Sequence, residues 1–257
     1  MKRMICLSIS VLLLLATAFA ADFWEKKDYK QWSQAECKKL LEDSPWAKPF
    51  NVISSDAGID TSQTNRTNTD SAAPYIKYQV QFRSAKPVRQ AIVRQGQLAQ
   101  KYDSLPVAQK QEFDKKADPF ISADLSEAVV VYVTYSTNNP DNDRDLARYW
   151  QAQTADLLKN TVALSNTKGE KIYLSNFTAE QAAGRSFQFI FPREVNGKPL
   201  LNGMQDKSLK LEFMYPIINC LGDPSPGCTP ASSQGTMGKG YLEFKVDKMI
   251  FDGTVAY

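Results

Sequence analysis

Residues 128–135 read Ala-Val-Val-Val-Tyr-Val-Thr-Tyr. An unbroken β-branched and aromatic run of this length predicts a central strand that is buried on both faces. On its N-terminal side, residues 75–83 alternate between apolar and polar side chains. This period of two predicts a half-buried strand, whose inward face would carry four residues: Ile76, Tyr78, Val80 and Phe82.

Helices are predicted on both sides of the central run. Pro87 can take the first position of a helix, because its missing N–H has no partner there. The apolar stripe of this helix would comprise Val88, Ala91, Ile92, Leu98 and Ala99. A second helix is predicted from Pro106 to about Lys116. Beyond the central run, an Asp within 138–143 would cap a third helix, whose buried side would comprise Leu146, Ala147, Trp150, Leu157 and Leu158.

From Asn160 onward the pattern is mostly β. Lys168-Gly169 separates two short β-prone runs and predicts a hairpin, and Asn196-Gly197 marks another turn. Three longer runs alternate between apolar and polar residues and predict half-buried strands: 186–191, 208–215 and 241–250.

The order of these elements favours an α+β fold. We expect a single mixed, mostly antiparallel sheet of about five to seven strands, with helices packed on one face. Residues 74–257 would form this core, and residues 21–55 a helical segment docked on it. Residues 56–73 are dense in Thr, Ser, Asn and Asp and predict a flexible polar loop.

The first twenty residues have the pattern of a secretory signal peptide. Lys2 and Arg3 precede an apolar run from Ile5 to Phe19, and Ala18-Phe19-Ala20 is an A-x-A cleavage site. We therefore expect export, with cleavage near Ala20 and a mature chain that is periplasmic or extracellular. No later segment is long and apolar enough to predict a membrane span.

Three of the four cysteines remain after that cleavage. Cys220 and Cys228 bracket a turn-rich stretch, and an oxidising compartment favours a disulfide between them. Cys37 is then unpaired. A buried apolar role is the preferred interpretation, and an intermolecular bridge is the alternative.

The N-terminal segment carries a clear helix start. Ser33 and Glu36 form a capping box, and Asp43-Ser44-Pro45 should end the helix because the residue before a proline avoids helical angles. Three tryptophans crowd this region: Trp24, Trp32 and Trp46. They could form a sugar-stacking platform, but the preferred interpretation is that they pin the segment onto the core.

The element W-S-x-x-E followed by L-L-x-D-S-P-W-A-K, at residues 32–48, resembles one found in small exported bacterial proteins of unknown function. Residues 84–89 and the closing stretch 249–253 are also similar to such proteins. The resemblance implies export and a single domain, and it implies no activity.

The chain contains no histidine. This excludes Ser-His-Asp triads, Cys-His pairs and H-E-x-x-H zinc sites. Asp141-x-Asp143-x-Asp145 has the opening spacing of a calcium loop but lacks the later glycine and carboxylate. Ser165 and Lys168 match S-x-x-K only formally. A glycosidase-like carboxylate pair needs no histidine, and four acids lie on or near predicted β segments: Glu180, Glu194, Glu212 and Glu243.

Charge and motifs together favour binding over catalysis. Lys and Arg number 31 against 28 Asp and Glu, and removal of the two signal-peptide cations leaves a nearly neutral chain with no electrostatic case for nucleic acid. We expect an exported, non-catalytic binding or envelope-accessory protein, with no cofactor or metal, whose partner is an unknown protein or small molecule. The alternative is a histidine-free hydrolase with a carboxylate pair. A third hypothesis, self-association, depends on a surface-exposed Cys37.

Overall fold

The computed structural model describes residues 22–53, 75–180, 184–216 and 237–257. Its helices are α2 (Phe23–Lys26), α3 (Gln34–Glu42), α4 (Lys86–Ala99), α5 (Val107–Ile121), α6 (Pro140–Gln151) and α7 (Ala155–Leu158). Its longer strands are β1 (Ala47–Ile53), β2 (Tyr75–Phe82), β3 (Ala128–Thr137), β7 (Ser186–Pro192), β10 (Ser208–Pro216) and β11 (Met237–Lys245). Its shorter strands are β4 (Ala163–Ser165), β5 (Lys171–Tyr173), β6 (Asn176–Ala179), β8 (Glu194–Val195), β9 (Lys198–Pro199), β12 (Ile250–Phe251) and β13 (Thr254–Val255).

The α+β class is confirmed, with a five-stranded main sheet in the order β1-β2-β3-β7-β6. Every pairing in it is antiparallel, and the predicted Val-rich strand is its central member. The inward face of β3 is fully buried, as with Val131 and Val133. The outward face is less covered than predicted, because Val130 and Thr134 are only half-buried.

The later strands form a second sheet, in the order β11-β10-β4-β5, instead of extending the first. The two sheets pack face to face. Phe82 of the main sheet meets Phe244 of the second with ring centroids 4.8 Å apart, and Tyr78 meets Phe213 at 5.7 Å. The alternation of apolar and polar residues does not show which sheet a strand joins. A strand has one apolar face to bury whether it extends the main sheet or packs against it in a second sheet.

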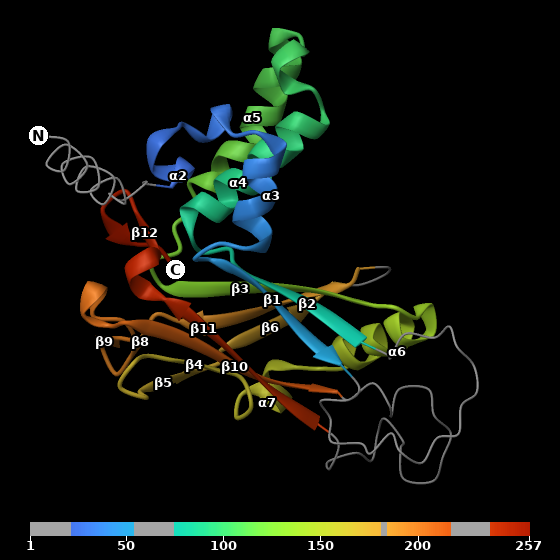
Figure 1. Cartoon of the computed structure of the whole chain (residues 1–257), viewed down its shortest axis with the longest axis vertical. Coiled ribbons are helices and arrows are strands. Elements are labelled where there is room, and N and C mark those ends of the chain that lie inside the picture. The colour runs from blue at the N-terminus through green and yellow to red at the C-terminus, as the bar shows by residue number, and fades with distance from the viewer. Residues whose placement is uncertain (1–21, 54–74, 181–183, 217–236) are drawn as a thin grey trace, which may run out of the picture.

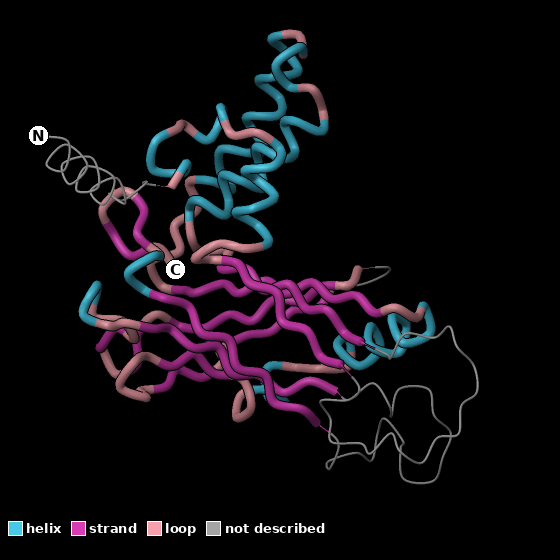
Figure 2. Tube along the Cα trace, in the orientation of Figure 1, coloured by secondary structure: helices cyan, strands magenta, loops and turns pink. Residues whose placement is uncertain are grey.

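Helices α3, α4 and α5 form a layer on the other side of the main sheet, above its strands in Figure 1 and cyan in Figure 2. Two outward-facing glutamines of β2 tie this layer to the sheet. The Nε2 of Gln79 donates to the backbone carbonyls of Leu41 and Glu42, and that of Gln81 donates to Leu41. They satisfy carbonyls at the C-terminus of α3 that have no partner within the helix.

The N-terminal segment folds as its motif predicts. Ser33 and Glu36 form the capping box that begins α3, and the three tryptophans are buried in the core. Cys37 is a free and fully buried cysteine, so the hypothesis of self-association through a surface thiol loses its support. Cys220 and Cys228, the predicted signal peptide and the predicted polar loop lie outside the described residues.

Three predictions about the helices are wrong in detail. Asn139, not an aspartate, caps α6, and Leu157 is exposed on the separate short helix α7. Helix α5 continues past Lys116 to Ile121 and contains Pro119. A proline removes a hydrogen bond from the helical ladder, and this loss falls in the last turn of α5.

Helix α4 buries polar side chains that its apolar stripe did not indicate. They are Arg89, Arg94 and Gln97. The Nε of Arg94 donates to the carbonyl of Trp32 at 3.0 Å. Near the other end of the helix, Arg89 donates to the carbonyl of Ser84, which precedes α4, and to that of Ile121, which ends α5. Each buried guanidinium therefore fixes α4 to a neighbouring segment through hydrogen bonds.

Replacing Ser33 with alanine should destabilise the protein by about 1 kcal/mol, because the capping hydrogen bond to the backbone N–H of Glu36 is lost. Thermal and urea unfolding at neutral pH measure this cost. A control, Ser104→Ala, removes an exposed hydroxyl outside the capping box and should have a smaller effect. Equal losses in the two variants would contradict a stabilising cap.

The capping box also predicts a pH dependence. Chiefly the hydrogen bond from Lys27 lowers the pKa of Glu36 from 4.5 to about 2. The stability that ionised Glu36 contributes is therefore present above pH 4.5 and is lost as the pH falls toward 2. The stability difference between wild type and Glu36→Gln should shrink across this window, as acid titration followed by circular dichroism would show. A constant difference would contradict the lowered pKa.

Candidate functional site

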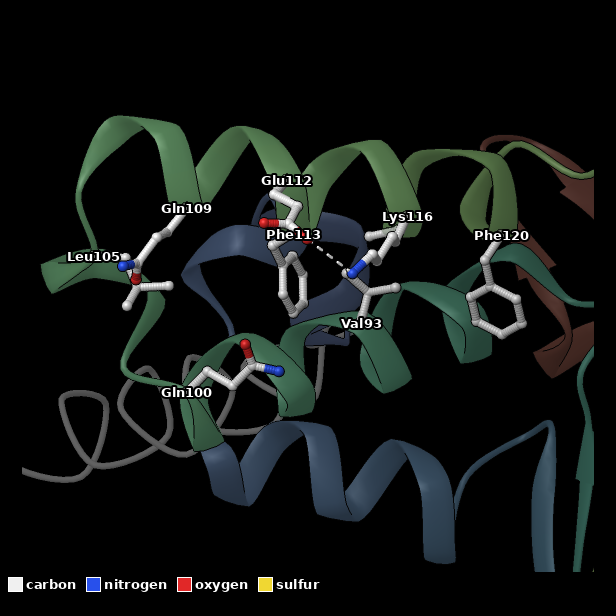
Figure 3. A pocket seen from close by; sticks show the side chains of 9 residues that line it. Val93, Gln100, Leu105, Gln109, Glu112, Phe113, Lys116 and Phe120 are labelled. Atoms are coloured by element: carbon white, nitrogen blue, oxygen red, sulfur yellow. Dashed lines mark hydrogen bonds and ion pairs between the residues drawn. The ribbon is translucent and has the colours of Figure 1, made fainter.

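A groove of about 590 Å³ runs along the seam between α4 and α5. Figure 3 shows its floor and rim. Its floor is mostly apolar and is formed by Val93, Leu105, Phe113, Ala117 and Phe120. Its rim is polar and comprises Gln100, Gln109, Glu112 and Lys116. The volume lies within the range of small-molecule sites, and the apolar floor with a polar rim is a lining common in such sites.

The groove exists because α5 is only loosely covered. Of the fifteen residues of α5, Ala117 alone is buried. Phe113 points toward α4 at Gly96, where an added Cβ would lie 3.7 Å from its ring, while Phe120 remains 36% exposed. Since most helical stability in proteins comes from packing of an apolar face, a long helix with so little buried surface has a face free for another partner.

Polar contacts hold α5 at both ends. At its C-terminal end, the guanidinium of Arg89 donates to the carbonyl of Ile121 from Nε and Nη2, at 3.2 and 3.1 Å. Nearer the other end, Lys110 donates to the carbonyl of Asp103 at 3.0 Å. At the middle of the helix, Tyr102 of the short 3₁₀ segment η5 (Tyr102–Ser104) donates to Asp114 at 2.6 Å. That hydrogen bond raises the pKa of Tyr102 to about 12. The walls of the groove are therefore fixed by contacts outside it.

The groove carries one acidic and one basic side chain, Glu112 and Lys116. Its single carboxyl, Glu112, is exposed and forms an ion pair with Lys116 at 3.1 Å, one turn along the same helix. The rim offers amide, carboxylate and ammonium groups around an apolar floor. Such a site can bury apolar side chains while the rim stays hydrated, but it contains no pair of acids for hydrolysis.

Two smaller hollows have a different character. A polar cleft of about 350 Å³ lies between α3, α4 and the outward face of β2 and β3, and its lining includes Gln79, Gln81 and Lys77. A hollow of about 290 Å³ is lined by Trp24, Glu25 and Asp252 among others. Asp252 is two-thirds exposed and is paired with Lys86 at 3.3 Å, so that hollow does not shield an acid from water.

Of the four predicted carboxylate candidates, the structure brings two onto one face and places the other two elsewhere. Glu180 follows β6 and accepts a hydrogen bond from Tyr132, and Glu194 lies in β8. Glu212 and Glu243 are diagonal neighbours on one exposed face. Glu212 accepts from Lys171 and Lys239, and chiefly the Lys171 hydrogen bond lowers its pKa. A general acid needs a raised pKa, so Glu212 does not meet the requirement.

The other candidate motifs are structural. Asp143 is buried, where it accepts from the backbone N–H of Thr137 and from Arg185, both at 2.8 Å. Asp141 and Asp145 instead pair with arginines on the exposed side of α6. Ser165 is buried in β4, whereas Lys168 lies in the exposed turn. Within the described residues, no three acidic or cysteine side chains gather as metal ligands.

Sequence reasoning missed the groove. The signal was present in Phe113 and Phe120, which are seven positions apart and so share one face of α5.

Comparison of the chain with family models, with curated proteins and with solved structures finds no match. In the part of the chain that the structure describes, no helix has the length and apolar character of a membrane span.

Proposed function

We propose that this chain is an exported binding protein whose α4–α5 groove receives an amphipathic helix from a partner protein. The observation that carries this proposal is the apolar floor exposed along the seam of two helices. Helices with one apolar face bind such grooves through side chains spaced three, four and seven residues apart. The signal-peptide pattern of residues 1–20 supports export.

The shape of the groove favours a helix over a compact ligand. The lining residues of α5 run from Gln109 to Phe120, about three helical turns. The apolar residues Phe113 and Phe120 mark two positions along this length, and Val93 faces them from α4 (Figure 3). A partner helix could place successive apolar anchors over them.

The rim matches the polar flanks of an amphipathic helix. Gln100 and Gln109 offer both hydrogen-bond donors and acceptors. Glu112 and Lys116 contribute opposite charges, so the groove favours neither a strongly acidic nor a strongly basic partner. Affinity should therefore depend on apolar burial and only weakly on salt.

Several observations support binding over the hydrolase alternative. The carboxyls with shifted pKa values among the described residues, Glu36, Asp124 and Glu212, are all shifted downward. Burial raises the pKa of the Cys37 thiol to about 11, and a thiol must ionise to act as a nucleophile. These groups lack the properties of a general acid or an activated nucleophile.

Replacing Phe120 with serine should weaken the binding of an amphipathic Leu/Lys/Glu peptide without net charge about tenfold, because an apolar anchor of the groove is lost. Fluorescence anisotropy with a labelled peptide measures this change. A scrambled peptide of the same composition, with no apolar face, should bind at least tenfold more weakly to the wild type.

Val107→Ser is the matched control, because Val107 is a 71% exposed apolar residue of the same helix outside the groove lining. It should leave peptide affinity unchanged. Equal losses in the two variants, or equal affinity for both peptides, would contradict the proposal. Saturable binding of dodecanoate that depends on Phe120, with no peptide binding, would identify a small amphiphile as the occupant instead.

A further inference from the structure

The outward face of the four-stranded sheet carries two tyrosines in one cross-strand row. Tyr241 of β11 lies opposite Glu212 of β10, which lies opposite Ala163 of β4, which lies opposite Tyr173 of β5. Directly opposed residues of antiparallel strands point to the same side of a sheet. Tyr173 and Tyr241 are 50% and 58% exposed, so the row ends in an exposed ring on each side.

Charged side chains fill the space between and around these rings. Lys171 and Lys239 both bind the Glu212 carboxylate, at 2.9 and 3.1 Å. The ammonium of Lys239 also lies 4.8 Å from the centre of the Tyr241 ring. This surface, here called the tyrosine face, is completed by exposed residues that the register places on the same side: Lys210, Glu243 and Lys245.

From this arrangement we infer that the tyrosine face binds an acidic polysaccharide. A sugar ring presents C–H groups that pack on an aromatic face, and hydroxyls that bind ammonium and carboxylate groups. Three strand spacings separate the tyrosines, about 14 Å, so one chain of several sugars is needed to reach both. Four lysines against two glutamates give the face an excess of positive charge, which complements a chain of sugar acids.

The composition of the face argues against other macromolecules. Lysine and glutamate are depleted from protein–protein interfaces, whereas lysine and glutamate side chains lie between the two tyrosines. The face is therefore unlike the surface that a protein partner usually binds. Single-stranded nucleic acid also stacks on aromatic rings, but it offers fewer hydroxyl donors than a polysaccharide, whose hydroxyls can donate to the exposed Glu243 carboxylate. The face lies on the second sheet, on the opposite side of the main sheet from the helical layer (Figure 1), so it is a site separate from the groove.

The test measures binding of a short oligogalacturonate to the full chain by isothermal titration calorimetry. Tyr173→Ala and Tyr241→Ala should each weaken binding about tenfold, and Lys171→Gln should weaken it while reducing its salt dependence. The matched control is Tyr75→Ala, because Tyr75 is an exposed tyrosine of the main sheet. It should leave affinity unchanged, and all variants should keep the unfolding midpoint of the wild type to within a few degrees.

Each alternative outcome is decisive. The absence of saturable oligogalacturonate binding at millimolar concentration would overturn the inference, as would equal losses from Tyr75→Ala and Tyr173→Ala. A neutral cello-oligosaccharide that binds as tightly would show that the lysines do not select acidic sugars. Tighter binding of an oligothymidylate would identify nucleic acid as the ligand.

Discussion

Replacing Trp150 with alanine is expected to lower the free energy of unfolding by about 3–5 kcal/mol, the range for truncating a buried large aromatic residue. Trp150 is fully buried and stacks on Phe187 with ring centroids 4.0 Å apart. It also meets Tyr78 edge-on at 6.4 Å. Its removal would leave a cavity where α6 joins two strands of the main sheet. Urea denaturation followed by circular dichroism measures the loss.

Leu157→Ala is the control for this prediction. Leu157 lies on the next helix, α7, and is largely exposed. Its truncation should change stability by less than about 0.5 kcal/mol. A Trp150 variant that loses no more than the Leu157 variant would show that the aromatic cluster does not hold α6 to the sheet.

The second large effect is expected from Arg89→Met, which should cost about 3 kcal/mol. The buried Arg89 guanidinium donates to the carbonyls of Ser84 and Ile121, and more weakly to those of Arg83 and Ala123. Methionine fills much of the same space but donates nothing, so these carbonyls lose their partner. Because Ile121 ends α5, the groove should also lose order, and peptide affinity should fall with stability.

Two further variants make this prediction specific. Arg89→Lys keeps the charge but not the planar fork of donors, and it should restore only part of the stability. Arg144→Met removes an exposed arginine whose pair with Asp141 lies on the surface of α6, and it should change stability by less than about 0.5 kcal/mol. Wild-type stability in Arg89→Met would show that these carbonyls do not need the guanidinium.

The strands were largely predictable because their pattern has a local cause. In β2, Ile76, Tyr78, Val80 and Phe82 are all fully buried, as alternation predicts. Asn196 and Gly197 both adopt positive φ, which is the requirement of the tight hairpin turn that joins β8 and β9. The capping box of α3 likewise depends only on residues three positions apart.

Longer-range partners were not predictable in this way. Whether Phe82 faces a helix or a second sheet is decided by residues such as Phe244, far along the chain. Arg94 is a surface residue by type, and it is buried because the carbonyl of Trp32 lies within reach of its Nε. The type of a side chain and the periodicity of apolar residues do not reveal contacts between residues that are far apart in the sequence.

The candidate site depends on the same kind of contact. A groove forms where two helices leave apolar surface uncovered, and the crossing of α4 and α5 is set by Arg89 and by the Tyr102–Asp114 hydrogen bond. The tyrosine face similarly requires the register that aligns Tyr241 with Glu212. The sequence shows tyrosines and lysines alternating with apolar residues, but only strand pairing places them in one row.

Site-specific photocrosslinking tests the helix-binding groove most directly. Benzoylphenylalanine would be placed at position 120 and, separately, at position 107, and each protein irradiated with the labelled amphipathic peptide. We predict crosslinked peptide at position 120, suppressed by excess unlabelled peptide, and only background at position 107. Equal crosslinking at the two positions, or none at position 120, would contradict a partner helix in the α4–α5 groove.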